Sequence, residues 1–199
     1  MKRFDPGDTE LCTARAVYRA EGRTLLRAVV SVAVPRGFER IRQFYEELAR
    51  AVTRWVGEVE GKRLAERFAA LEGAGARSRF GIGTLAVTGG PVYADGGLLT
   101  MVCRSVYRSP DGAVREERQS AEVWRPEEET LLPANQIVRS DSGKKLRPAP
   151  GFGPDGCYRS GGEVVFFRNP AHGEPFAEFR VPLCAGRKPR KAKKTQRNA

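Results

Sequence analysis

The feature that most constrains the fold is a change of hydrophobic period after Pro35-Arg36-Gly37. From Phe38 to Leu71 the apolar residues recur at steps of three and four, which indicates one amphipathic helix. At 1.5 Å per residue this helix spans roughly 50 Å, and Gly57 and Gly61 mark where we expect it to bend or break. We expect the apolar face of this helix to pack against a sheet as part of the core rather than to line a ligand groove. Its apolar positions are Ile41, Phe44, Tyr45, Leu48, Val52, Trp55, Val56, Val59, Leu64, Phe68 and Leu71.

The segments around the helix alternate with period two, the pattern of half-buried strands. Runs 11–19 and 23–34 flank a short turn ending in Gly22, which predicts a hairpin. Further strands are predicted over 78–88, 98–108 and 113–124, and again in the last third of the chain. The predicted order is β-β-α-β-β-β, a loop, then β-β-β. We therefore expect an α+β fold, an antiparallel sheet of hairpins packed on one long amphipathic helix.

Strand 113–124 and the segment around residues 157–183 suggest where a surface would form. Residues 113–124 are mostly polar until Val123-Trp124, so this strand is expected at an edge or facing solvent. In the last third, a strand over 164–167 and another over 176–183 flank a loop at Asn169–Pro175. We expect these two strands to close the sheet as core strands.

Three stretches resemble a bacterial domain family of unknown function. They are Leu98 to Trp124 as a central hairpin, Glu129 to Val138 as a leucine-rich turn, and Gly156 to Phe179 as a closing segment. The family's domain forms the extracellular part of RsiV-type anti-sigma factors that respond to lysozyme. It also accompanies the catalytic domain of PdaC-type deacetylases. The resemblance implies a non-catalytic binding domain, since the deacetylase chemistry belongs to another domain.

No catalytic motif or metal-ligand spacing stands out. His172 is the only histidine, and a catalytic His needs a nucleophile or an orienting carboxylate beside it. Glu174 is near in sequence, but the simpler interpretation is a polar loop tip. We predict no enzyme activity and no cofactor or metal. Asn169, His172 and Glu174 are instead the candidate partner-binding residues of the loop.

The four cysteines contain no CxxC pair, so we expect four reduced, buried side chains. The start, MKRFDPGDTE, has no apolar core of a signal peptide, and no run is long enough to span a membrane. A cytoplasmic location is therefore expected.

The net charge of +11 is concentrated at the C-terminus. We predict a single α+β domain over 1–186 and a disordered basic tail over 187–199. A polyanion such as nucleic acid or a ribosome could bind this tail electrostatically, whereas the alternative is a tail that only aids solubility. The basic residues of the tail are Arg187, Lys188, Arg190, Lys191, Lys193, Lys194 and Arg197.

Two functions follow as hypotheses. The first is a binding or scaffold module for an unknown protein partner, which would use the Asn169–Pro175 loop and strand 113–124 as a grooved or edge surface. The second is a nucleic-acid-associated or ribosome-associated protein that acts through its tail.

Overall fold

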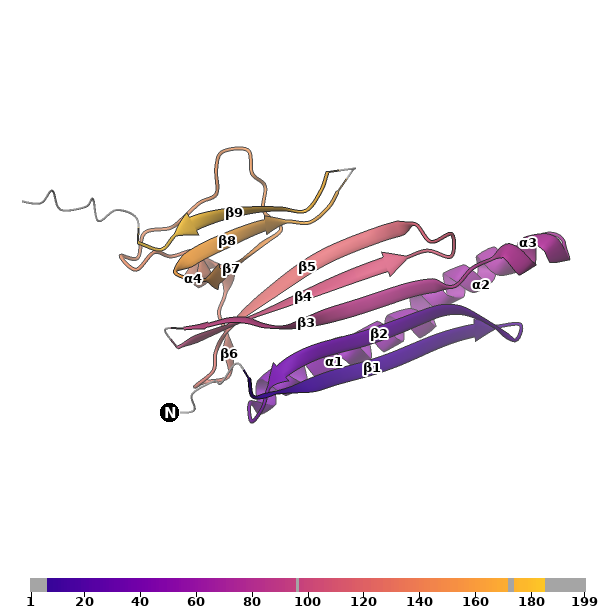
Figure 1. The fold of residues 1–199 in the computed structure, drawn as a ribbon, viewed down its shortest axis with the longest axis horizontal. Helices are drawn as coiled ribbons and strands as arrows, with labels where there is room; N and C mark the ends of the chain where they lie inside the picture. Colours follow the sequence, from indigo (N-terminus) through magenta and orange to yellow (C-terminus); the bar gives the residue numbers. More distant parts are fainter. Residues whose placement is uncertain (1–6, 96, 172–173, 185–199) are drawn as a thin grey trace, which may run out of the picture.

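The computed structural model describes residues 7–95, 97–171 and 174–184. It confirms the α+β class: a long helix packs on one face of a curled, mostly antiparallel sheet, and a small second sheet packs on the other face (Figure 1). The predicted tail lies outside the described residues.

The long helix is continuous over residues 39–69 but changes its winding in the middle. A π-helical turn containing Gly57 joins the two α-helical parts and ends before Gly61, where the sequence predicts a bend or break. Gly61 lies against Tyr18 of the first strand, and a Cβ there would overlap the Tyr18 ring and the Val56 carbonyl. The parts are α1 (Glu39–Trp55), η1 (Val56–Glu60) and α2 (Gly61–Ala69).

The main sheet has six strands in the spatial order β1-β2-β3-β4-β5-β6. All neighbours are antiparallel except β2 and β3, which are parallel. This pair departs from the predicted all-antiparallel sheet, because the long helix returns the chain to the end where β2 began. The strands are β1 (Thr9–Ala20), β2 (Arg23–Pro35), β3 (Gly83–Asp95), β4 (Leu98–Arg108), β5 (Val114–Arg125) and β6 (Thr130–Leu131).

The third strand is shifted relative to its prediction over 78–88. A short helix, α3 (Ala74–Arg79), occupies the first part of that range, and β3 continues through Gly89-Gly90-Pro91. Beyond Gly89 this strand has lost its pairing with β2, so Pro91 lies on an edge where its missing N–H is tolerated. Gly89 is required because a Cβ would come within 2.6 Å of the Val102 carbonyl oxygen.

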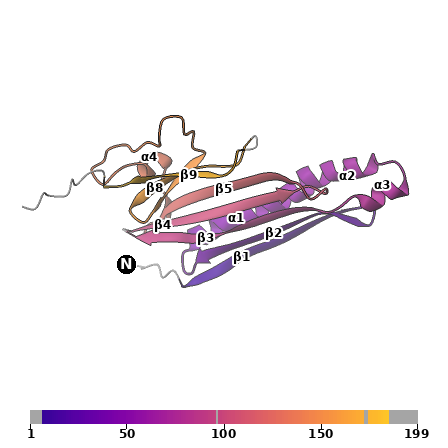
Figure 2. The same ribbon diagram turned by 45° about the horizontal axis from the view of Figure 1, so that its top comes forward.

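The last three strands form their own sheet, so the expectation that they close the main sheet was wrong. They pair in the order β7-β8-β9 and pack on the outer face of the main sheet near β5 (Figure 2). Tyr158, Val165 and Phe167 of the small sheet form one buried cluster with Val123 of β5. The elements of this region are α4 (Ala134–Ile137), β7 (Gly156–Ser160), β8 (Glu163–Arg168) and β9 (Ala177–Pro182).

Two buried polar groups lie between the helix and the sheet. Tyr45 is fully buried and donates a hydrogen bond of 2.9 Å to the carboxylate of Glu122 on β5. Burial raises the pKa of Glu122 above its ordinary value. Farther along the helix, Glu60 accepts hydrogen bonds from Tyr107 and from Arg63, so its buried charge is partnered.

The cysteines only partly follow the prediction. No disulfide joins any of the four. Cys12 and Cys103 are buried and Cys157 is half-buried, but Cys184 is exposed and its thiol donates to Asp141 at 3.0 Å. Over residues 7–95, 97–171 and 174–184, none of the helices combines the length and apolar character needed to cross a membrane.

Candidate functional site

Three hollows converge on one segment of β5, residues 114–120. One lies on the outer side of the strand, one lies between the strand and the long helix, and a smaller one lies beneath the loop that joins β8 to β9. Arg118 lines all three. The segment belongs to the polar strand that the sequence placed at an edge.

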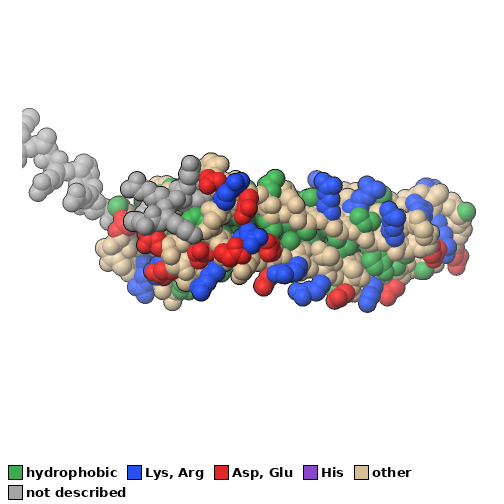
Figure 3. Space-filling model, turned by 90° about the horizontal axis from the view of Figure 1, so that it is seen from below, with side chains coloured by type: hydrophobic (Ala, Val, Ile, Leu, Met, Phe, Trp, Pro, Cys, Tyr) green, Lys and Arg blue, Asp and Glu red, His purple; other side chains and the backbone are tan. Residues whose placement is uncertain are grey.

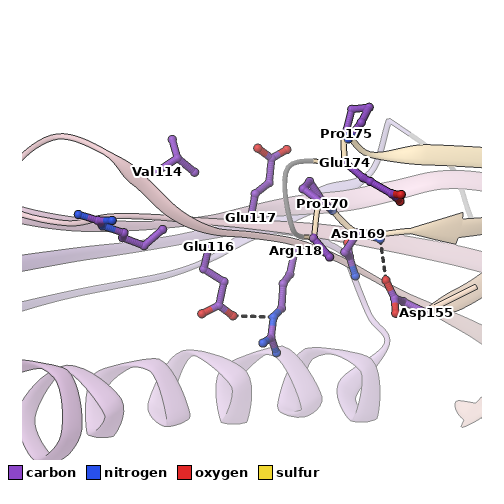
Figure 4. A pocket seen from close by; sticks show the side chains of 11 residues that line it. Val114, Glu116, Glu117, Arg118, Asp155, Asn169, Pro170, Glu174 and Pro175 are labelled. Atoms are coloured by element: carbon purple, nitrogen blue, oxygen red, sulfur yellow. Dashed lines mark hydrogen bonds and ion pairs between the residues drawn. The ribbon is translucent and has the colours of Figure 1, made fainter.

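The outer groove has a volume of about 890 Å³ and separates β5 from the loop after β8 (Figure 4). Its walls carry both acidic and basic side chains, with prolines on the loop side. This is the location that the sequence hypothesis gave for a grooved surface, although binding there stays a prediction. The lining residues are Val114, Arg115, Glu116, Glu117, Arg118, Asp155, Asn169, Pro170, Ala171, Glu174 and Pro175.

Asn169 holds the loop against the edge of β5. Its side-chain oxygen accepts a hydrogen bond from the backbone N–H of Gln119 at 2.6 Å, and its side-chain nitrogen donates to the Gln119 carbonyl at 3.2 Å. The amide thus takes the place that a neighbouring strand would occupy. Its own backbone N–H donates to Asp155 at 2.7 Å. Asn169 is therefore a positioning residue for the groove.

Glu174 stands on the other side of the loop. It forms an ion pair of 2.7 Å with Arg168, and its backbone N–H donates to the Ala171 carbonyl at 2.9 Å, which closes a tight turn. In Figure 4 Pro170, Glu174 and Pro175 stand above β5 on the same side as Glu117. The third predicted loop residue, His172, lies outside the described residues.

The inner pocket, of about 240 Å³, lies between the helix and the inner face of β3, β4 and β5. Leu48, Val52 and Trp55 form its helical wall, and small side chains on the strands leave the space open. Glu116 and Arg118 stand at its rim, joined by an ion pair of 2.5 Å, and both point toward the helix (Figure 4). The strand residues that line it are Leu85, Val87, Cys103, Ser105, Tyr107, Glu116, Arg118 and Ser120.

The thiol in this pocket is not an activated nucleophile. Burial, together with the nearby Glu122 carboxylate, raises the pKa of Cys103 to about 12. The thiol is therefore protonated at neutral pH, whereas a reactive cysteine needs a lowered pKa. In the part of the chain that is described, no group of three or more His, Cys, Asp or Glu side chains is placed to hold a metal ion.

The edge of β5 is open between two interruptions. At one end the pairing with β4 shifts register, so that Arg115 is an extra, bulged residue. At the other end the outward N–H and C=O of Gln119 are already hydrogen-bonded to the Asn169 side chain. Glu117 lies two residues before Gln119, so its N–H and C=O point outward in the same direction. They form no hydrogen bond with any described residue.

A polar atom beside this edge also lacks a partner. The Gln119 side-chain nitrogen is buried and has no hydrogen-bond acceptor within the described ranges. Gln119 lines the third hollow, of about 200 Å³, together with Asn169, Pro170 and Phe176. An acceptor from a bound partner would satisfy this nitrogen.

Sequence reasoning located the groove but missed the inner pocket. Leu48, Val52 and Trp55 were assigned to the core because they fall on the apolar face of the helix. The pocket exists because Ser105 and Ser120 stand opposite them on the strands. The only signal in the sequence is the small, polar character of these two inward positions. It predicts a pocket only once the pairing register of the strands shows that both residues face the helix.

Comparisons with known proteins identify the fold. No protein-family model matches the sequence, and no curated protein matches it. A DUF3298 family protein of Pseudomonas aeruginosa PAO1 superposes with a TM-score of 0.56 at 11% identity, covering 89% of this chain and 91% of that one. The chain has the DUF3298 fold.

A second solved structure agrees. A member of the DUF3298 family from Bacteroides fragilis superposes with a TM-score of 0.52 at 12% identity, covering 88% of this chain and 89% of the other. At these identities the similarity concerns the fold alone. It supports the resemblance to a bacterial domain of unknown function at that coarse level.

Proposed function

We propose that this protein is a non-catalytic binding domain that takes an extended segment of a partner protein along β5, in the outer groove. The observation that carries the proposal is the convergence of three hollows on residues 114–120 of one open strand. The sequence resemblance to the domain of RsiV-type anti-sigma factors and PdaC-type deacetylases supports a binding role. A cytoplasmic location stays a prediction.

The backbone of β5 gives the direction of the bound segment. The outward N–H and C=O of Glu117 can form one pair of strand-type hydrogen bonds with a partner. Because successive side chains of an extended segment point to opposite faces, one set would face the outer groove and the next the inner pocket.

The two faces select different side chains. The inner pocket is walled by Leu48, Val52 and Trp55 and suits an aliphatic or aromatic side chain. A cavity of about 150 Å³ already accommodates a benzene ring, so the inner pocket is large enough. The outer groove has ion-paired walls and prolines, which suit polar side chains.

A pair of substitutions at Glu117 tests the proposal. Glu117→Pro removes the outward N–H without touching the ladder to β4, while Glu117→Gln removes only the charge and the ion pair with Arg104. Peptides would be selected against the wild-type chain from a displayed library of random 12-residue sequences. We expect the selected peptides to bind the Gln variant and to lose at least tenfold in affinity for the Pro variant.

The proposal fails if the two variants bind the selected peptides equally, or if the library yields no binder. Ser105→Leu provides a second check, since leucine would fill the inner pocket and leave the edge intact. Peptides with an apolar anchor should lose affinity for it.

The basic residues 187–199 support a second candidate, which we also propose: association with nucleic acid or a ribosome. The observation that favours it is seven Lys and Arg residues without an acidic one. Deleting 187–199 should abolish binding to ribosomes or nucleic acid at low salt. Full retention of binding after the deletion would refute it.

A further inference from the structure

The small sheet divides the outer face of the main sheet into a covered end and an open end. At the covered end, Val102, Ala121 and Val123 pack beneath the small sheet. At the open end, the same face carries arginine, threonine and small aliphatic side chains. We call this second region the open face; the β1–β5 strands that bear it lie in front of the long helix in Figure 1.

The strand register assembles the open face from β1–β4, and Glu117 of β5 continues it beside Val106. Val17, Arg27, Thr84 and Arg108 lie side by side in one row. Arg15, Val29, Ala86 and Val106 form the next row, and Thr13, Ser31, Thr88 and Arg104 the third. Residues paired across a sheet share a face, so these side chains form one continuous surface.

This face is rich in unpaired positive charge. Arg15, Arg19, Arg27, Arg104 and Arg108 are all exposed. Of these, only Arg104 forms an ion pair, with Glu117, within the described residues. Figure 3 looks onto the β1 side of the molecule and shows basic side chains along its upper right with few acidic ones among them.

The arginines form two lines rather than a cluster. One line runs along β1 and β2 and the other along β4, with Thr84, Ala86 and Thr88 of β3 between them. Strands lie about 4.8 Å apart, so the two lines are about 10–14 Å apart. The major groove of B-form DNA is about 12 Å wide, which places its two flanking phosphate rows at a similar separation.

We propose that the open face binds double-stranded DNA through its phosphates, across a major groove. Arginine together with serine and threonine hydroxyls is a typical phosphate-binding set. The face carries no aromatic ring on which the bases of a single strand would stack. A-form RNA has a narrow, deep major groove that does not match the spacing. This surface adjoins the peptide groove, because its Arg104 forms an ion pair with Glu117, and it is separate in sequence from the basic tail.

The test uses the full-length chain and a 24-base-pair DNA duplex. The face variant is Arg15→Ser/Arg27→Ser/Arg108→Ser. The control variant, Arg50→Ser/Arg54→Ser/Arg67→Ser, removes three exposed arginines from the helix and keeps the same net charge and tail. Binding is measured between 50 and 200 mM salt. A third variant with lysine at the three face positions tests whether positive charge restores binding.

Each phosphate contact contributes about −0.9 to the slope of log affinity against log salt, so the face variant should lose about three units of slope. At 0.1 M salt its affinity should fall by about 10²–10³-fold, while the helix control changes little and the lysine variant recovers most of the slope.

The proposal is overturned if the wild-type chain does not bind the duplex, or if the face and helix variants lose the same slope. Parallel titrations use an RNA duplex and vesicles containing 30% phosphatidylserine. If the face variant loses binding only to vesicles or only to RNA, the surface serves that partner and the DNA proposal is wrong.

Discussion

Asn169 determines whether the loop after β8 stays attached to β5, and its substitution gives a quantitative prediction. Asn169→Ala removes two hydrogen bonds to the Gln119 backbone and leaves a partly buried N–H and C=O without partners. At about 1 kcal/mol net for each bond, the free energy of unfolding should fall by about 2 kcal/mol. For a domain of this size the melting temperature should fall by about 4–8 °C.

Asn169→Asp is the matched variant, because it keeps the shape of the side chain but replaces the N–H donor by an oxygen and adds a negative charge. Its carboxylate can accept from the Gln119 N–H but repels the Gln119 carbonyl at neutral pH. Once protonated, the carboxyl group can donate to that carbonyl, so the destabilisation should shrink as pH falls. Thermal unfolding followed by circular dichroism at pH 4 and pH 7 measures both effects.

Amide hydrogen exchange locates the effect. In the Asn169→Ala variant the Gln119 amide should exchange much faster than in the wild type, while the amide of Arg118, which faces β4, keeps its protection. A variant that melts within 1 °C of the wild type with an unchanged Gln119 amide would refute the role given to Asn169.

Four further substitutions probe the packing. Glu122→Gln should raise the melting temperature at pH 8 but not at pH 4. The pKa of Glu122 is raised in the folded state, so the protein loses stability as pH rises through that pKa and the carboxyl group ionises. Equal shifts of the melting temperature at both pH values would contradict this prediction. Gly61→Ala should lower the free energy of unfolding by more than about 2 kcal/mol, because a Cβ there would overlap its neighbours. Gly57→Ala, which has open space around it, should raise the free energy of unfolding by about 0.5–1 kcal/mol. Urea unfolding measures both, and similar effects at the two sites would contradict the close approach at Gly61. Ser105→Leu should stabilise by about 1–2 kcal/mol in the same assay by filling the inner pocket, and a loss of stability would show that the pocket is smaller than described.

The long helix and the hairpins could be predicted because each depends on a local period. The parallel pairing of β2 and β3 depends instead on the length of the helix compared with the length of β2. A helix over residues 39–69 rises about 1.5 Å per residue and runs about as far as the 13 residues of β2 extend at about 3.3 Å each. The chain therefore re-enters the sheet where β2 started, and β3 must run in the same direction.

The separate small sheet was harder to foresee. Val164 to Phe167 read as core strands, and all four are buried. Val165 and Phe167 pack on the outer face of β5, whereas Val164 and Phe166 pack in a separate cluster with Val138 and Leu146. The sequence signal lies in β5 itself, whose outward positions change from Gln119 and Glu117 to Ala121 and Val123. That change from polar to apolar residues marks the boundary of the covered end. It indicates that the small sheet packs there only once it is known that these side chains lie on the outer face of β5.

The groove, too, could be predicted only in part. An edge strand and a Pro-rich loop were sufficient to locate it, because polar alternation and turn residues are local signals. The role of Asn169 depends on a contact between residues 50 positions apart, and no local pattern predicts it.

Amide exchange at Glu117 tests the central claim, that β5 offers an open edge to an extended partner, most directly. In the free protein the Glu117 amide should exchange close to the rate of an unstructured chain, while its neighbour Arg118 is protected by β4. On addition of a peptide selected for binding, Glu117 should become protected. A Glu117 amide that is already protected in the free protein, or one that stays unprotected in the complex, would contradict the account.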